Sequence, residues 1–119
     1  MDKFNFDYSE YSDILHIHKT NENTKGSVEL GDFTLDFGKN DEIVGVEIEH
    51  ASEFFVNVDI DQKSLTELKS AEFVIDNKNP QVQIIFLKLE FPKAIKKIPV
   101  PMPVVNHAST KWLIEYKLF

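Results

Sequence analysis

The amino-acid sequence predicts a mainly β, α+β fold, with about six or seven strands in antiparallel sheets and one or two short helices in the middle of the chain. Aromatic residues make up 12% of the chain, ten of them Phe, and aromatic residues favour strands. Several short segments alternate apolar and polar residues, which is the period of a strand. Only four Gly and five Pro are present, so we expect each to mark a break. A chain of 119 residues is typical of one domain, which we expect over residues 1–119.

The N-terminal half contains the clearest strand signals. Residues 13–18 predict a strand whose His16 and His18 share one face, and residues 27–30 predict a short one. Residues 33–37 and 43–49 both alternate around a short polar turn, which predicts an antiparallel hairpin. On its second strand we expect one face to carry Val44, Val46 and Ile48.

Two helical segments are expected next. Residues 51–55 predict one helical turn, and residues 61–69 predict a short helix. Its start has two candidate signals. Asp61 can act as the N-cap, or Ser64 and Glu67 can form a capping box.

The C-terminal half predicts more strands. Residues 72–76 read as a strand, and residues 81–91 as the longest one, central because its middle is apolar on both faces. Residues 99–103 contain three Pro, which predicts a stiff surface connection near polyproline II and excludes a central strand. Residues 111–118 predict a last strand, with one face carrying Trp112, Ile114, Tyr116 and Leu118.

Composition argues against several classes of protein. The absence of Cys excludes disulfides and Cys-ligated metals. All thirteen cationic residues are Lys, and the net charge is −7, which disfavours a nucleic-acid partner. The start of the chain has no signal-peptide pattern, and no segment approaches the ~20 apolar residues of a membrane helix. We therefore expect a soluble, cytoplasmic protein that binds neither membrane nor nucleic acid.

One pattern resembles a known family. Asp7-Tyr8, residues 13–17, Leu35-Asp36 and above all the Ile-Val-Gly-Val-Glu-Ile-Glu-His-Ala-Ser of residues 43–52 are similar to the small prokaryotic family called domain of unknown function 2283. The resemblance covers about residues 4–55. It implies a small β-rich module with no established activity and no known catalytic residues. It also suggests an antitoxin-like partner role beside a neighbouring toxin.

The chain departs from that family in two places, and it is longer. The family usually has an aromatic residue at the position of His16 and a glycine at the position of Glu42. Residues 56–119 form an extension, predicted to hold a helix and further strands, that no motif anchors. Within the shared pattern, Gly45 in a strand indicates a bulge or a closely packed neighbour.

The candidate metal ligands are His16 and His18. Residues at i and i+2 of a strand point the same way, and two imidazoles so placed can chelate Zn²⁺, Ni²⁺ or Fe²⁺. With Glu22 the spacing is similar to a cupin metal motif, although Glu10 stands where that motif needs Gly. The alternative is two half-exposed histidines on a solvent face. His50 and His107 have no ligand partner at a diagnostic spacing.

No coherent set of catalytic residues emerges, and no cofactor is implied. The chain has no nucleophile elbow, no phosphate-binding glycine loop and no dinucleotide fingerprint. We therefore expect a non-enzymatic domain that acts through protein association, as a homodimer or with a small protein partner. The alternatives are a metal- or ligand-binding module centred on His16 and His18, and the antitoxin-like partner.

Overall fold

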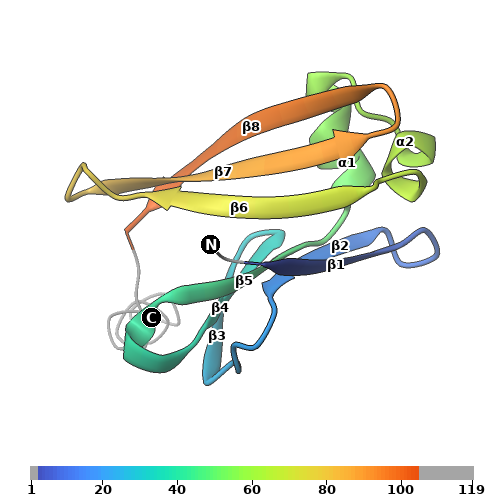
Figure 1. Cartoon of the computed structure of the whole chain (residues 1–119). Coiled ribbons are helices and arrows are strands. Elements are labelled where there is room, and N and C mark those ends of the chain that lie inside the picture. Colours follow the sequence, from blue (N-terminus) through green and yellow to red (C-terminus); the bar gives the residue numbers. More distant parts are fainter. Residues whose placement is uncertain (1–2, 105–119) are drawn as a thin grey trace.

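The computed structural model describes residues 3–104, which form two antiparallel sheets that face each other (Figure 1). The first sheet has five strands in the order β1-β2-β5-β4-β3, and the second has three in the order β6-β7-β8. The strands are β1 (Phe4–Ser9), β2 (Ile14–Lys19), β3 (Gly26–Leu30), β4 (Phe33–Phe37), β5 (Ile43–Ile48), β6 (Ser70–Asp76), β7 (Val82–Phe91) and β8 (Ala94–Pro103). The predicted mainly β, antiparallel fold class is confirmed.

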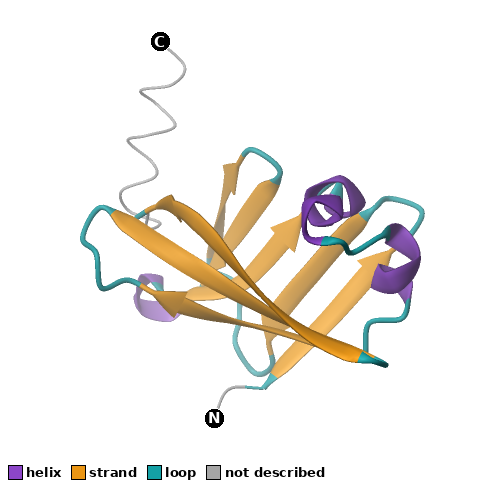
Figure 2. Ribbon diagram, turned by 90° about the horizontal axis from the view of Figure 1, so that it is seen from above, coloured by secondary structure: helices purple, strands orange, loops and turns teal. Residues whose placement is uncertain are grey.

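Four short helical segments complete the fold. These are α1 (Ala51–Phe55), α2 (Gln62–Thr66) and the 3₁₀ turns η1 (Lys39–Asp41) and η2 (Val56–Val58). Figure 2 shows α1 and α2 together at one end of the sheets, with η1 at the opposite end. Within residues 3–104 no helix has the length and apolar character needed to cross a lipid bilayer.

The space between the sheets is filled by alternate residues of the strands. Leu15 and Ile17 of the first sheet and Ile85 and Leu87 of the second are fully buried and belong to one core cluster. Each strand therefore turns its apolar face inward and leaves its other face outward.

The hairpin of β4 and β5 is confirmed, but it contains an irregularity that the alternation conceals. The register shifts between Asp36 and Phe37, so that Phe37 pairs with Ile43 while Asp36 pairs with Gly45. As a result Ile43 joins the core cluster and Val44, although buried, does not. The expectation that Val44 shares the inner face with Val46 and Ile48 is therefore wrong, because a bulge adds one residue there.

The helix starts agree with one of the two predicted signals. α1 spans the predicted 51–55. The Asp61 side chain accepts a hydrogen bond from the Ser64 amide at 2.8 Å, which makes Asp61 the N-cap of α2. That bond lowers the pKa of the Asp61 carboxyl. The capping box is wrong, because α2 ends at Thr66 and Glu67 follows it as the C-cap.

The three-stranded sheet confirms one prediction and corrects another. β7 is central, as predicted. The proline-containing segment is part of strand β8 and not a free connection, since Pro99, Pro101 and Pro103 pair opposite β7. The Val104 amide donates to the Gln81 carbonyl at 3.4 Å, so even-numbered residues of β8 turn their amides toward β7. At odd-numbered residues of β8 the backbone nitrogen faces the free edge of the sheet. The three prolines stand at such residues, so their lack of an N–H group removes no hydrogen bond to β7.

Two further differences from the predicted strands lie near the two ends of the chain. Strand β1 has no counterpart among the predicted strands, although its Phe4 and Phe6 pack against the core. The predicted strand over residues 111–118, and His107 with it, lie outside the described residues.

Candidate functional site

The outer face of the five-stranded sheet carries two cross-strand rows of mostly polar residues, which we call the polar face. Pairing between neighbouring strands places the first row in the order Asp7, His16, Glu47, Thr34 and Glu29. The second row runs in the order Asn5, His18, Gly45, Asp36 and Ser27. The two predicted metal ligands therefore lie next to each other on this face, with ring centroids 5.7 Å apart.

A gap at Gly45 lets His16 and Asp36 meet across strand β5. His16 Nε2 lies 3.0 Å from Asp36 Oδ2, although the two residues stand on strands that do not pair with each other. A Cβ at Gly45 would lie 2.5 Å from Asp36 Oδ2 and 2.7 Å from His18 Cδ2. The glycine is thus the space that this contact needs, which confirms the predicted close approach of a neighbour.

The contact changes the titration of both partners. The hydrogen bond to Asp36 raises the pKa of His16, and the carboxylates of Glu47 and Asp7 act in the same direction. The hydrogen bond from His16 lowers the pKa of Asp36. Ser27 Oγ also donates to Asp36, at 2.8 Å. Asp36 therefore carries a negative charge that is held by two donors.

This arrangement does not reproduce a nucleophile-activating triad. In such a triad the histidine lies between the nucleophile and the carboxylate. Here the carboxylate of Asp36 lies between Ser27 and His16, and the Ser27 hydroxyl donates to that carboxylate. The Asp36 carboxylate therefore orients the Ser27 hydroxyl, and the histidine is not placed to take a proton from it.

The ring nitrogens of His18 do not bond to His16 or Asp36 but to other groups. Its Nδ1 lies 2.8 Å from the Lys19 carbonyl, and its Nε2 lies 2.9 Å from Thr24 Oγ1. One ring nitrogen is thus engaged with the end of β2 and the other with the β2–β3 connection. A metal ion chelated by His16 and His18 would require His18 to leave at least one of these contacts.

A second polar network ties the start of the chain to the first helix, and we call it the latch. Asp13 Oδ1 accepts from the Tyr8 hydroxyl at 2.6 Å and from the Ser52 amide at 3.0 Å. Asp13 Oδ2 accepts from Ser52 Oγ at 2.7 Å. The Tyr8 oxygen in turn accepts from Gln62 Nε2 at 3.1 Å. The turn before β2 is thereby joined to α1 and α2.

The latch shifts both titratable groups. Burial and the hydrogen bond to Asp13 raise the pKa of Tyr8 to about 12. Burial opposes ionisation of Asp13, but the hydrogen bonds from Tyr8 and Ser52 outweigh it and lower the pKa of Asp13. Asp13 also adopts the left-handed conformation, with φ of 57°, which Asp and Asn tolerate better than most residues.

A third polar group lies at the end of strand β5. His50 Nδ1 lies 3.3 Å from Asp32 Oδ1, and the ligand atoms of Asp32, Glu49 and His50 all lie within 4.8 Å of one another. The contact with Asp32 raises the pKa of His50. All three residues are exposed, so we interpret them as a solvated turn.

The outer face of the three-stranded sheet is different in character, and we call it the apolar face. Pairing places Val74 beside Phe86 and Phe86 beside Pro99, and it places Ile84 beside Pro101. Of these side chains Val74 is 61% exposed, and Ile84 and Phe86 are half-buried. The apolar face consists of Val74, Val82, Ile84, Phe86, Pro99, Pro101 and Pro103.

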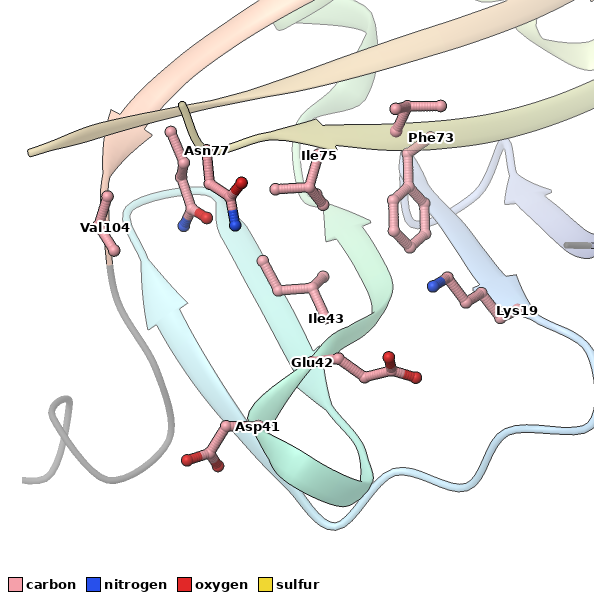
Figure 3. Close-up of a pocket in the computed structure, with 10 residues that line it drawn as sticks. Lys19, Asp41, Glu42, Ile43, Phe73, Ile75, Asn77 and Val104 are labelled. Carbon is pink, nitrogen blue, oxygen red and sulfur yellow. The ribbon is translucent and has the colours of Figure 1, made fainter. Parts of the chain in front are cut away.

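A groove opens between the two sheets at the end where β8 finishes (Figure 3). Its volume is about 440 Å³. Ile43 and Ile75 face each other across it, Phe73 lies deeper, and Glu42 stands at its rim (Figure 3). Val104, the last described residue, also lines it. Sequence reasoning missed this groove because its walls come from segments far apart in the chain.

Comparison with known proteins places the polar networks in a family context. Residues 5–52 match the family "Protein of unknown function (DUF2283)". The predicted resemblance to this family is thereby confirmed for the N-terminal segment. The matched segment contains Asp13 and Ser52 of the latch, together with Asp36 and Gly45, which form the Gly45 gap.

A relative in the archaeon Methanocaldococcus jannaschii, named "Uncharacterized protein MJ0789", is 39% identical over 57 residues. The alignment covers 48% of this chain and 48% of the relative, so the chain spans about half the length of the curated relative it matches. No solved structure matches the chain. The DUF2283 match ends before α2 and the three-stranded sheet, so the apolar face and most of the groove lie outside it.

Proposed function

We propose that this protein acts through protein association, and that two copies pack the apolar faces of their three-stranded sheets together. The observation that carries the proposal is the apolar face itself. Strand β7 is apolar on both sides over its middle, yet only its inner side is covered by the other sheet. A contiguous exposed apolar patch rimmed by polar residues is typical of a protein–protein contact.

The rim favours a second copy with a particular symmetry. Glu72 of β6, Lys88 of β7 and Lys97 of β8 form one cross-strand row beside the apolar face. A two-fold axis parallel to the strands places β6 of one copy opposite β8 of the other. It sets the apolar rows against each other and brings Glu72 opposite Lys97 of the second copy. It also places the two Lys88 side chains opposite each other, each paired with Glu72 of its own chain at 3.6 Å. A two-fold interface of this kind is self-complementary.

The prolines favour packing of faces over pairing of edges. Because Pro99, Pro101 and Pro103 present no N–H at the free edge of β8, a further strand cannot pair along that half. The same prolines leave a rigid apolar surface on the outer face. Association at this sheet is therefore directed to its face.

The test is the oligomeric state of the full chain and its variants over a concentration series up to about 1 mM, measured by size-exclusion chromatography with light scattering. We expect a dimer that Phe86→Lys converts to a monomer. The matched control is Tyr11→Lys, which adds the same charge at a fully exposed aromatic residue of the β1–β2 turn. We expect this control to remain dimeric.

The predicted symmetry is tested by charge reversal. Glu72→Lys alone should weaken the dimer, since it would place lysine opposite Lys97 of the second copy, and adding Lys97→Glu should restore it. A wild-type chain that stays monomeric at every concentration would overturn the proposal. A dimer indifferent to Phe86→Lys would place the contact elsewhere and overturn it as well.

Metal binding by His16 and His18 is the second candidate, favoured by one observation. The two rings are adjacent on the polar face, and the Asp36 carboxylate lies beside His16. Purification without a histidine tag followed by metal analysis tests it. Retained Zn, Ni or Fe that is lost in the double variant His16→Ala with His18→Ala supports this function, and a metal-free wild-type protein in the presence of these ions removes it.

A further inference from the structure

The groove between the sheet ends has an apolar wall and a polar rim, and it lies at the point where the described chain stops. Ile43 and Phe73 are buried residues of the core cluster, and Ile75 packs against that cluster. The groove is therefore an extension of the core that reaches the surface. Val104 lies at its edge, and fifteen residues, 105–119, follow it in the sequence.

We propose that residues 111–118 of the same chain occupy this groove. The segment alternates, and one face carries Trp112, Ile114, Tyr116 and Leu118. Four large apolar side chains on one face require an apolar partner. The walls formed by Ile43, Phe73 and Ile75 supply one.

The connection is long enough for the segment to return. Residues 105–110 can span at most ~20 Å when extended, and the groove begins at Val104 itself. They include Asn106 and Ser109, which favour turns. A tethered segment meets its site at an effective concentration in the millimolar range, so binding within one chain is favoured over capture of a segment from another copy.

The charges at the rim also fit this occupant. Asp41 and Glu42 are exposed acids at the groove, which one lysine, Lys19, also lines, so two acids and one base leave the charged side chains of the groove with a net charge of −1 (Figure 3). The segment carries Lys111 and Lys117 against a single acid, Glu115. An opposite net charge favours docking and orients the segment.

The chain provides a built-in probe, because Trp112 is its single tryptophan. We expect Trp112 fluorescence in the full chain to be shielded from acrylamide. Ile75→Lys, which places a charge in the groove, should raise the quenching constant several-fold toward that of a free tryptophan. The matched control Ile95→Lys makes the same change on β8 at a residue that is 62% exposed and should leave quenching unchanged.

A cross-link tests the position without disturbing the core. The natural chain has no Cys, so the pair Asn77→Cys with Ile114→Cys can form only one intramolecular disulfide. Asn77 lines the groove and is exposed (Figure 3). Asn57 of η2 is also exposed, and η2 directly follows α1, which lies at the opposite end of the sheets (Figure 1). At micromolar protein we expect the Asn77 pair to oxidise within one chain at least about tenfold more completely than Asn57→Cys with Ile114→Cys.

Each outcome decides the matter. Selective intramolecular oxidation of the Asn77 pair supports the proposal. Equal oxidation of both pairs, no oxidation of either, or a disulfide-linked dimer from the Asn77 pair would overturn it, the last by showing that a second copy fills the groove. Val74 belongs to both surfaces, but Phe86 does not line the groove, so Phe86→Lys tests the dimer without changing a residue of the groove.

Discussion

The polar face and the apolar face belong to the same molecule but use their side chains in opposite ways. On the polar face, His16, Asp36 and Ser27 bond to one another, and His18 bonds to the neighbouring connection. On the apolar face, the side chains of Val74, Ile84 and Phe86 do not belong to the core cluster that the described residues form. The polar side chains of the first face therefore stabilise the five-stranded sheet, and the second face is the surface that we propose a second copy covers.

The difference follows the boundary of the family match. The DUF2283 match covers residues 5–52, which contain almost all of the five-stranded sheet and the Tyr8, Asp13 and Ser52 part of the latch. The three-stranded sheet begins at Ser70, outside the match. Proteins that share only the matched segment therefore need not share the association proposed here.

The largest effect is expected from breaking the latch. Asp13→Ala removes the acceptor of three hydrogen bonds and places alanine in a left-handed conformation. We expect the free energy of unfolding to fall by about 3 kcal/mol, measured by urea denaturation. Asp13→Asn keeps the backbone preference and one acceptor oxygen, so its loss should be smaller. Equal stability of the Ala variant and wild type would show that the latch is not structural.

Filling the gap at Gly45 should come next. Gly45→Ala forces its Cβ against Asp36 and His18 in the middle of the sheet, and we expect a loss of about 2 kcal/mol. In an Asp36→Ala background part of the crowding is gone, so the same substitution should cost less. Full additivity of the two substitutions would mean that the Gly45 gap does not serve the Asp36 contact.

The sequence predicts features that depend on residues close together in the chain, and it misses features that depend on residues far apart. The β4–β5 hairpin, the Asp61 cap and the central place of β7 all follow from patterns within a few residues. The bonds of Asp13 to Ser52 and of His16 to Asp36 join residues 39 and 20 positions apart, and no local pattern indicates them. Strand β8 was missed because proline reads as a break unless its edge position is known.

The contact between His16 and Asp36 predicts a pH dependence that the apolar face lacks. The pKa of His16 is raised above 6.5, so its stabilising contribution is complete below pH 6.5 and is lost as the pH rises through the higher folded-state value. The pKa of Asp36 is lowered below 3.8, so its contribution is complete above pH 3.8 and is lost as the pH falls through the lower folded-state value.

The stability advantage of wild type over His16→Gln should therefore be larger at pH 5.5 than at pH 8.5, as denaturation at each pH would measure. The same substitution in an Asp36→Asn background is the control, and there the pH dependence should be much reduced. A His16 resonance that titrates at or below pH 6.5 in the folded protein would contradict the assignment.

The smallest effect on stability is expected from a polar contact of the three-stranded sheet. Glu72 and Lys88 form an ion pair of 3.6 Å whose side chains are 42% and 50% exposed. Exposed pairs of this kind contribute little, so we expect Glu72→Ala to change the free energy of unfolding of the monomer by about 0.5 kcal/mol or less. Denaturation of the Phe86→Lys monomer with and without this change measures it free of any association. A loss as large as that of Asp13→Ala would mean that polar contacts stabilise both sheets alike, and the division between the two faces would then fail.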